Sequence, residues 1–524
     1  MIPPWQAALL TLLAGACLRG RWQGWLYLLQ LDEYQLRRLA LSARRRLVRD
    51  WPWQLGLLLG GGAMAAAAFP GTLSPALPLA LACLLPLATQ RPFGRRGVLR
   101  WTGRARRLAG VSGALLLAAL FLVLWWGWPG ALVLGVVDLL VLAALAGALA
   151  LTVPYERRRR LGYMRQAQAR IASTRPVVVG ITGSYGKTTT KLFLSQLLDS
   201  PETPCFATPE SFNTTLGVCR AVNEGLNPEH RMAIVEMGAY RPGEIAEICS
   251  FTHPRVGIIT AVGVMHLERF GSRQRIALAK SELLAALPED GVAVLPSDIA
   301  ERGTLLARLR APVVWVGATG DRWWAESLEL SAQGTSFRLR GSAGEDEPIS
   351  AAIHGRHAVA DLLCALAAAA ELGVGLSELV ARAAGLAGAP HRLEVSQAGG
   401  LTIIDDAYNS NPDGAAEALR LLATLPGQRR VLVTPGYVEL GPLQEREMRE
   451  LGRRAAEVCS HVILVGPRQS AALARGLSQA GYPEDQVTVV ASLEQAQLRL
   501  PAVAGPGSVV LFENDLPDSF LETA

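Results

Sequence analysis

Hydrophobic residues are distributed unevenly along this chain, and their pattern changes near residue 155. Before that point, five apolar stretches of helical length alternate with arginine-rich segments. A helix needs about 20 residues to cross the hydrocarbon core of a bilayer, so the pattern predicts a multi-span helical membrane region of about five helices. The predicted spans run near residues 3–18, 54–69, 71–87, 108–128 and 129–153.

The charges between the apolar stretches predict an orientation. Arginines cluster in residues 19–52, in residues 90–107 and at Arg157–Arg160, whereas the hairpin tips near residues 70 and 129 carry no charge. Because positively charged loops stay on the cytoplasmic side, we expect a multi-pass protein of the inner (cytoplasmic) membrane with cytoplasmic catalytic domains. The lipid bilayer is then a partner. The net charge of +6 has the same origin, so we expect no nucleic-acid partner.

After residue 155 the pattern is that of a globular α/β protein. Short β-branched runs alternate with helical patterns after a charged cytoplasmic linker at residues 156–175. This alternation predicts a P-loop-type α/β ATPase domain over residues 176–388 and a C-terminal Rossmann-like α/β domain over residues 389–524. The membrane region accounts for residues 1–155.

A glycine-rich loop follows the first β-branched run. Pro176–Ile181 is typical of a buried parallel strand, and a helical pattern leads from Thr190 to Leu198. In a loop between such a strand and helix, the backbone amides and the helix N-terminus can surround phosphate oxygens. A lysine in the loop can reach the terminal phosphates, and a threonine hydroxyl can bind Mg²⁺. We therefore expect ATP and Mg²⁺ as cofactors. The predicted ATP contacts in the loop are Gly183, Ser184, Tyr185, Gly186, Lys187, Thr188 and Thr189.

Lysine is rare in this chain. Of 51 basic residues, three are lysine, namely Lys187, Lys191 and Lys280. A lysine that persists where the chain otherwise uses arginine can mark chemistry that arginine cannot perform, although three residues can also reflect chance.

The loop sequence Thr-Gly-Ser-Tyr-Gly-Lys-Thr-Thr at residues 182–189 resembles the phosphate loop of the Mur ligases, which build the peptidoglycan stem peptide. The resemblance extends through the last two thirds of the chain and is closest to the branch that adds D-alanyl-D-alanine. It implies an ADP-forming acid–amino-acid ligase of cell-wall synthesis that forms an amide bond through an acyl phosphate. The implied partners are ATP, a peptidoglycan precursor as carboxylate acceptor, and an amino acid or D-Ala-D-Ala-like amine.

The resemblance also assigns a metal-binding and catalytic group. Glu236 ends a predicted strand, at the edge of an open α/β sheet where ligands bind. Mur ligases have a magnesium-binding glutamate and histidine in segments like those of Glu236 and His266, and a carbamylated lysine like Lys280. The resemblance implies that Thr188, Glu236, His266 and the carbamate of Lys280 bind Mg²⁺. It also implies that Lys187, Glu236, His266 and Lys280 are the catalytic residues. A solvated acid, a structural histidine and an exposed helix lysine are the alternatives from the residues alone.

Two further sets of contacts are implied. The family's Asn-Thr turn beside the substrate implies substrate contacts from Asn213, Thr214 and Thr215. The nucleotide contacts implied in the C-terminal domain are Arg392 for the terminal phosphate, Asp406 for the ribose, and Tyr408 and Asn409 near the base. A capped strand-to-helix turn is the alternative explanation for the Asp and Asn residues there.

Three segments depart from the family pattern. Residues 355–359 lack the asparagine after histidine, residues 435–441 read Pro-Gly-Tyr-Val-Glu-Leu-Gly where the branch has Gly-Asp-Met, and residues 513–518 are acidic where it has Lys-Gly-Ser-Arg. Since the carboxylate of an added dipeptide would need cations to bind it, the identity of the added amine stays open.

The predicted spans replace the family's UDP-binding domain, so we expect either a membrane-associated, lipid-linked acceptor or reduced UDP recognition. The alternative functions are a poly-γ-glutamate-type polymer ligase and a catalytically silent membrane scaffold.

Overall fold

The structure is a computed structural model that describes residues 19–30, 99–125, 137–210, 212–408 and 410–514, with single positions between residues 34 and 44. The chain forms two compact units that divide between Arg159 and Arg160. The predicted features that lie outside the described residues are the spans at 3–18, 54–69 and 71–87, Asn409, and the acidic residues 515–518.

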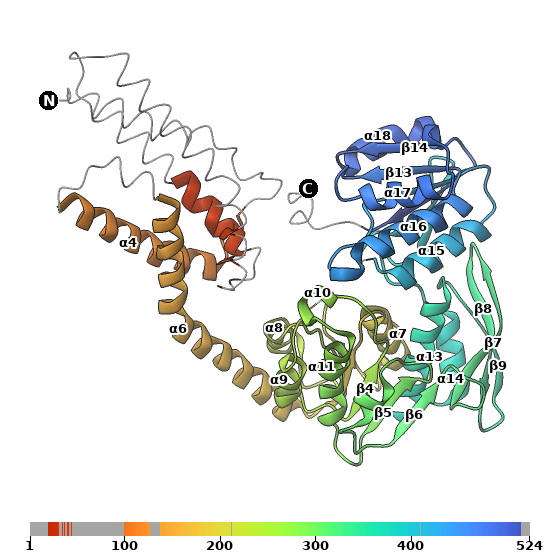
Figure 1. Ribbon diagram of the computed structural model, residues 1–524. Coiled ribbons are helices and arrows are strands. Elements are labelled where there is room, and N and C mark those ends of the chain that lie inside the picture. The colour runs from red at the N-terminus through yellow and green to blue at the C-terminus, as the bar shows by residue number, and fades with distance from the viewer. Residues whose placement is uncertain are drawn as a thin grey trace. The chain divides into compact units, whose positions relative to one another are not determined.

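The described part of the first unit consists of helices (Figure 1). Residues 19–30, α4 (Gly103–Trp125) and the first half of α6 (Val137–Thr174) share a hydrophobic core. Leu108 of α4 and Leu145 of α6 are fully buried in this core. Some apolar side chains of the predicted spans therefore pack against protein, while others, such as Leu117 of α4 (70% exposed) and Leu151 of α6 (64% exposed), do not.

The predicted multi-pass membrane localisation is wrong. Within the described residues, which leave out three of the five predicted spans, one helix, Leu140–Thr174, is long and apolar enough to cross a membrane. One such helix is weak evidence for a membrane region, because hydropathy counts apolar residues without revealing what they pack against. Moreover, α6 continues without a break through Arg157–Arg160, where the prediction places a linker.

A nine-stranded sheet forms the central part of the second unit, in the order β2-β3-β1-β4-β5-β6-β7-β8-β9. β1 lies between β3 and β4 and runs parallel to both. The loop after β1 is therefore flanked by the ends of β3 and β4, at the sheet edge where α/β proteins bind ligands. The strands are β1 (Val177–Thr182), β2 (Cys205–Ala207), β3 (Met232–Glu236), β4 (Val256–Ile259), β5 (Val292–Pro296), β6 (Val313–Val316), β7 (Trp323–Ser331), β8 (Gly334–Gly341) and β9 (Asp346–Ala351).

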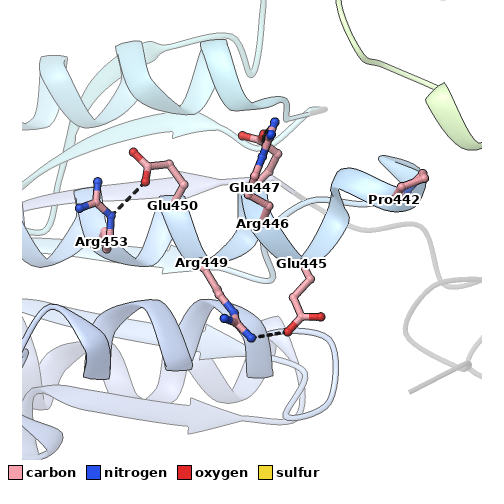
Figure 2. Close-up of a pocket in the computed structure, with 7 residues that line it drawn as sticks. All are labelled: Pro442, Glu445, Arg446, Glu447, Arg449, Glu450 and Arg453. Atoms are coloured by element: carbon pink, nitrogen blue, oxygen red, sulfur yellow. Dashed lines mark hydrogen bonds and ion pairs between the residues drawn. The ribbon is translucent and has the colours of Figure 1, made fainter. Parts of the chain in front are cut away.

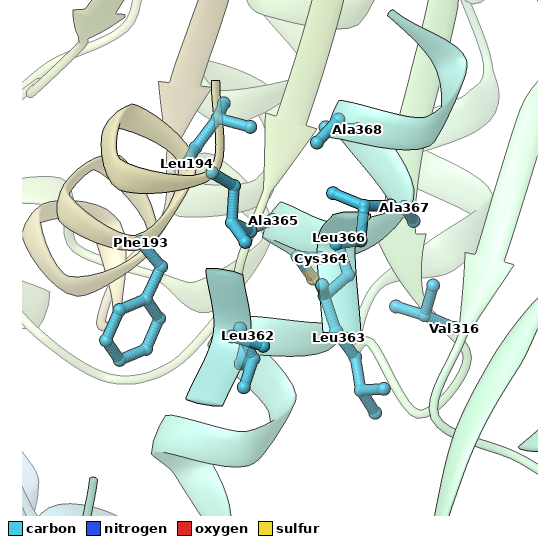
Figure 3. Close-up of a cluster of buried hydrophobic side chains, with 14 of the residues drawn as sticks. Phe193, Leu194, Val316, Leu362, Leu363, Cys364, Ala365, Leu366, Ala367 and Ala368 are labelled. Carbon is cyan, nitrogen blue, oxygen red and sulfur yellow. The ribbon is translucent and has the colours of Figure 1, made fainter. Parts of the chain in front are cut away.

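Successive residues of a strand face opposite sides of the sheet, and in the buried strands both sets of side chains are apolar. Both faces of the sheet are therefore covered by helices. Val179 of β1 contributes to the core beneath α7 and α13, while Val178 contributes to the core beneath α8 and α9. Figure 3 shows Phe193 and Leu194 of α7 beside Leu362 and the alanine-rich stretch of α13. The helices are α7 (Lys187–Leu198), α8 (Thr215–Gly225), α9 (Glu244–Thr252), α10 (Leu267–Phe270), α11 (Arg273–Ala285), α12 (Arg302–Leu306), α13 (Arg356–Glu371) and α14 (Leu376–Ala384).

A six-stranded sheet forms the C-terminal part, in the order β10-β11-β15-β12-β13-β14. All its pairs are parallel except β10 with β11. The two predicted α/β parts are thus confirmed as two sheets. The elements are β10 (Glu394–Ala398), β11 (Leu401–Asp406), α15 (Pro412–Thr424), β12 (Arg430–Thr434), η1 (Gly441–Leu443), α16 (Gln444–Val458), β13 (His461–Val465), α17 (Ala471–Gln479), η2 (Glu484–Gln486), β14 (Val487–Val490), α18 (Leu493–Val503) and β15 (Val509–Glu513).

Candidate active site

The glycine loop between β1 and α7 is held by the segment that follows β4. Ser184 accepts a hydrogen bond from the Gly263 N–H (2.9 Å), and the Tyr185 hydroxyl accepts one from the Val264 N–H (3.0 Å). Gly186 has φ 78°, a conformation that favours glycine, and it precedes the first residue of α7. The side chains of Ser184 and Tyr185, predicted as ATP contacts, therefore brace the loop in this structure.

Glu236, at the end of β3, is the centre of a buried polar cluster. Its Oε2 accepts from the Thr188 hydroxyl (3.1 Å) and pairs with Lys191 Nζ (2.9 Å), while its Oε1 accepts from Asn213 Nδ2 (2.9 Å). Its side chain is 1% exposed. Burial raises the pKa of this carboxyl, but the ammonium groups of Lys191 and Lys187 and the Asn213 hydrogen bond outweigh burial and hold the pKa below its usual value. Glu236 is thus an anion.

Thr188 and Glu236 fit a magnesium ion chemically. The hydroxyl of Thr188 and the carboxylate of Glu236 are hard oxygen donors, and their oxygens lie 3.1 Å apart. A second group with metal-ligand side chains, His391, Glu394 and Asp405, is largely exposed and already paired internally through His391 Nδ1 and Asp405 Oδ2 (2.7 Å).

Lys187 is the electrostatic centre of the predicted site. Its Nζ donates to the Gly183 carbonyl (2.9 Å), four residues back along the chain. Burial lowers the pKa of this lysine, Glu236 and Asp361 oppose that shift, and Arg392 adds to it. The charge of Lys187 also lowers the pKa values of His266 and Lys280. The fold therefore brings these predicted residues within electrostatic range of one lysine.

Lys280 lies in α11 and is 5% exposed. Burial, with a smaller effect of Lys187, lowers its pKa well below the usual value. Among the described residues, no carboxylate forms an ion pair with its amine. Lys280 is thus a buried amine, not the exposed helix lysine of the alternative interpretation.

His266 lies just before α10, where its ring meets a carboxylate from the C-terminal part. Its Nδ1 contacts Glu439 Oε2. Burial lowers the pKa of His266, and Glu439 opposes that effect. In the described part of the chain, no hydrogen bond or ion pair joins the side chains of His266 or Lys280 to the Glu236 cluster.

The predicted substrate turn has three different local roles. Asn213 orients Glu236, and the Thr214 hydroxyl caps α8 by accepting from the Gly217 N–H (3.3 Å). Thr215 donates to Glu247 Oε2 (2.8 Å). Side-chain groups of all three residues are thus bonded within the protein here.

The predicted nucleotide contacts of the C-terminal part gather at the carboxyl end of β11. The Arg392 guanidinium lies 4.5 Å from the centre of the Tyr408 ring, which is 46% exposed. Asp406 Oδ1 accepts from the Leu393 N–H (3.3 Å), and burial raises the pKa of Asp406 to about 7. Asn411 caps α15, so part of this motif also has the structural role of the alternative interpretation.

Glu513 and Asn514, where the sequence departs from the family pattern, form buried hydrogen bonds to the end of β12 and to the loop after it. Glu513 is fully buried and its Oε2 accepts from the Thr434 hydroxyl (2.6 Å). Asn514 donates to the Gly436 carbonyl (2.6 Å). These two side chains fix the loop after β12, which also departs from the family pattern.

Asp361 is a functional candidate that the sequence interpretation missed. It lies in α13 against Gly186, where a Cβ atom on the glycine would collide with the carboxylate. Its Oδ2 is buried without a hydrogen-bond partner, and burial raises its pKa to about 7. The sequence signal for Asp361 was a single acid within the alanine- and leucine-rich stretch of α13, where a carboxylate would be buried.

Replacement of Asp361 by asparagine is expected to stabilise the protein at pH 8 by about 1–2 kcal/mol and much less at pH 5. The carboxyl ionises near pH 3.8 in a model peptide and near 7 in the fold, so it costs stability progressively as the pH rises through that interval. Urea unfolding at both pH values measures the difference. Asp290→Asn is the control, since Asp290 is 68% exposed. Equal effects of Asp361→Asn at both pH values would contradict the prediction.

A hollow on the surface of α16 is unrelated to these residues (Figure 2). It is lined by charges that pair with one another, such as Arg449 with Glu445 (2.5 Å) and Arg453 with Glu450 (3.0 Å). Because these groups already have partners, the hollow carries no functional assignment.

Comparisons with known proteins agree with this arrangement. Residues 181–369 match the Mur ligase middle domain, and residues 391–513 match the Mur ligase, glutamate ligase domain. UDP-N-acetylmuramoyl-tripeptide–D-alanyl-D-alanine ligase of Mycobacterium leprae is 33% identical over 372 residues, covering 64% of this chain and 70% of that protein. The Escherichia coli enzyme of the same name is 30% identical, covering 60% and 70%.

Solved structures give the same answer. A crystal structure of MurF from Acinetobacter baumannii has a TM-score of 0.62 and 29% identity, covering 70% of this chain and 79% of that chain. MurF ligase from Thermotoga maritima in complex with ADP has a TM-score of 0.60 at 24% identity, which supports the fold.

The two sheets, the glycine loop and these matches define an ATP-dependent ligase. The chain belongs to the Mur ligase family, as its phosphate loop predicted. Family membership also favours an enzyme over the silent scaffold.

Proposed function

We propose that this protein joins a D-alanyl-D-alanine-like amine to the carboxylate of a peptidoglycan precursor and converts ATP to ADP and phosphate. The observation that carries the proposal is the buried cluster beside the phosphate loop, in which Glu236 accepts from the Thr188 hydroxyl (3.1 Å) and from Asn213 (2.9 Å). Similarity to D-alanyl-D-alanine ligases over 70% of their length favours this amine over that of a polymer ligase.

The proposed chemistry has two steps. A carboxylate oxygen of the acceptor attacks the γ-phosphorus of ATP, the bond to ADP breaks, and an acyl phosphate forms. The amine nitrogen then attacks the acyl carbon, phosphate leaves, and the nitrogen loses a proton to give the amide.

The chain's own residues hold the reacting groups in this scheme. Lys187 and Arg392 supply positive charge to the terminal phosphates. Thr188 and Glu236 would hold Mg²⁺, which would neutralise charge on the transferring phosphate. Addition of CO₂ to the Lys280 amine, with loss of one proton, would give a carbamate whose oxygens, together with His266, would hold a second metal ion. Asp406 and Tyr408 contact the nucleoside.

The test uses the purified full chain with Mg-ATP, UDP-N-acetylmuramoyl-tripeptide and a panel of amines. We expect ADP release that requires both acceptor and amine, with a product heavier by one dipeptide when D-alanyl-D-alanine is supplied. Mass spectrometry identifies the product, and glycine, L-alanine and L-glutamate are the competing amines. Absence of ADP release with every amine, from folded protein, would overturn the proposal.

The acceptor's carrier is decided by repeating the assay with a lipid-linked acceptor in place of the UDP-linked one. The lipid-linked acceptor followed from the predicted membrane spans and loses that support. We therefore expect the UDP-linked acceptor named in the relatives to be used in preference to a lipid-linked one.

A further inference from the structure

Glu439 connects the C-terminal part of the fold to the metal-site segment of the central part. It lies in the loop between β12 and η1, and its side chain is 12% exposed. Its Oε2 contacts His266 Nδ1, while its Oε1 accepts from Arg269 Nε (2.8 Å) and Nη2 (2.6 Å). Its carbonyl also accepts from the Glu268 N–H (3.2 Å). Glu439 thus bonds to three of the four residues from His266 to Arg269, at the start of α10.

The backbone at this contact is unusual on both sides. His266 has φ 58° and Glu439 has φ 61°, a left-handed conformation that side-chain-bearing residues rarely adopt. Such conformations persist where the surrounding structure requires them, and they cluster at functional sites. Here they aim an imidazole and a carboxylate at each other.

The His266 ring is also fixed by an aromatic neighbour. The Tyr240 ring lies edge-on to it with centres 4.8 Å apart, and the same ring lies 4.3 Å from the Arg269 guanidinium. Glu439 and Tyr240 therefore restrict the ring's rotation by two kinds of contact.

A carboxylate that accepts a hydrogen bond from one imidazole nitrogen fixes the tautomer, so the other nitrogen carries the lone pair. Glu439 accepts a hydrogen bond, so the proton of neutral His266 lies on Nδ1 and the lone pair of Nε2 is left for a cation. Carboxylate partners of this kind orient metal-bound histidines in many proteins.

We propose that Glu439 is a positioning residue that presents Nε2 of His266 to a divalent cation. The cation site is thereby complete when the loop after β12 is docked on α10. The inference rests on the proposed function, which makes His266 a metal ligand. It goes further by making metal affinity depend on a residue of the C-terminal part.

The competing explanation is that Glu439 merely docks the C-terminal part through Arg269. Two variants separate these roles. Glu439→Ala removes the partner of His266, whereas Arg269→Gln removes the bidentate ion pair and leaves the carboxylate beside the ring.

The first measurement is Mn²⁺ binding to the full chain with ADP, followed by electron paramagnetic resonance. We expect Glu439→Ala to weaken one Mn²⁺ site about 10- to 100-fold, as partners of metal ligands do when removed. Arg269→Gln should stay within about twofold of the unaltered protein. Equal weakening in both variants, or none in Glu439→Ala, would overturn the inference.

The second measurement is the ¹⁵N resonance of His266 in histidine-labelled protein. Its protonated nitrogen should be Nδ1 in the unaltered protein and in Arg269→Gln, and Nε2 in Glu439→Ala. An unchanged tautomer in Glu439→Ala would also overturn the inference. Retained ADP binding and melting temperature serve as controls for folding.

His266→Ala distinguishes this inference from its premise. If that variant binds Mn²⁺ normally, the metal assignment in the proposed function fails. If His266→Ala weakens Mn²⁺ binding and Glu439→Ala does not, the positioning role alone fails.

Discussion

Replacement of Lys280 by arginine is expected to abolish ligation while the protein stays folded and still binds ADP. Removal of one preorganised group that stabilises transition-state charge costs about 10²–10³-fold in turnover, and we expect at least this loss. The physical reason is that a neutral amine can add CO₂, whereas a guanidinium stays protonated in proteins. Lys280 is buried, and burial lowers the pKa of its amine well below the usual value, which favours the unprotonated form that adds CO₂.

A second substitution separates loss of the carbamate from crowding by the larger side chain. Lys280→Ala opens a space in α11, and a small carboxylate such as acetate can supply there the oxygens that the carbamate provides. We expect acetate to restore part of the activity of Lys280→Ala and none of that of Lys280→Arg. Turnover of Lys280→Arg within about tenfold of the unaltered protein would refute the carbamate role.

Replacement of Lys187 by methionine should remove nearly all ligation and weaken ATP binding. Methionine keeps an unbranched side chain that is one atom shorter and removes its charge, which we expect to cost about 10³-fold in turnover or more. In this structure Lys187 Nζ bonds to the Gly183 carbonyl, from which it can move to the terminal phosphates. Calorimetry with Mg-ATP and single-turnover kinetics measure the two effects separately.

Arginine at position 187 is the matched control for charge. A planar guanidinium does not reproduce a compact ammonium group, so Lys187→Arg should recover binding more than turnover. Normal single-turnover rates in Lys187→Met would show that the phosphate loop does not hold the transferring group.

Much of the α/β architecture could be predicted from the sequence, because its signals are local. The strand predicted at Pro176–Ile181 matches β1 (Val177–Thr182) within one residue, and the helical pattern predicted through Leu198 ends with α7 at that residue. Short β-branched runs and glycine turns specify such elements without long-range information. The glycine loop and the position of Glu236 at a strand end follow from the same signals.

The partners of the site residues could not be predicted, because they come from distant segments. Glu439 reaches His266 across 173 positions of the chain, and Lys191 meets Glu236 through the pairing of β1 with β3. No local pattern encodes these contacts. Only the rarity of lysine pointed to Lys191, because the sequence analysis treated all three lysines of the chain as candidates for chemistry that arginine cannot perform.

The membrane prediction failed for a related reason. Apolar helices are recognised by composition, but their environment depends on what packs against them. Leu108 and Leu145 contribute equally to a hydropathy average whether they meet lipid or each other, and in the structure they share one core.

The three lysines also make this protein unusually easy to map by protein chemistry. An endoprotease that cuts after lysine has three cleavage sites, all between residues 187 and 280. If an alkylating reagent traps an adduct on residue 280, the enzyme skips that position and leaves residues 192–524 as one fragment. A gel would then report the occupancy of a single buried amine in the intact polypeptide.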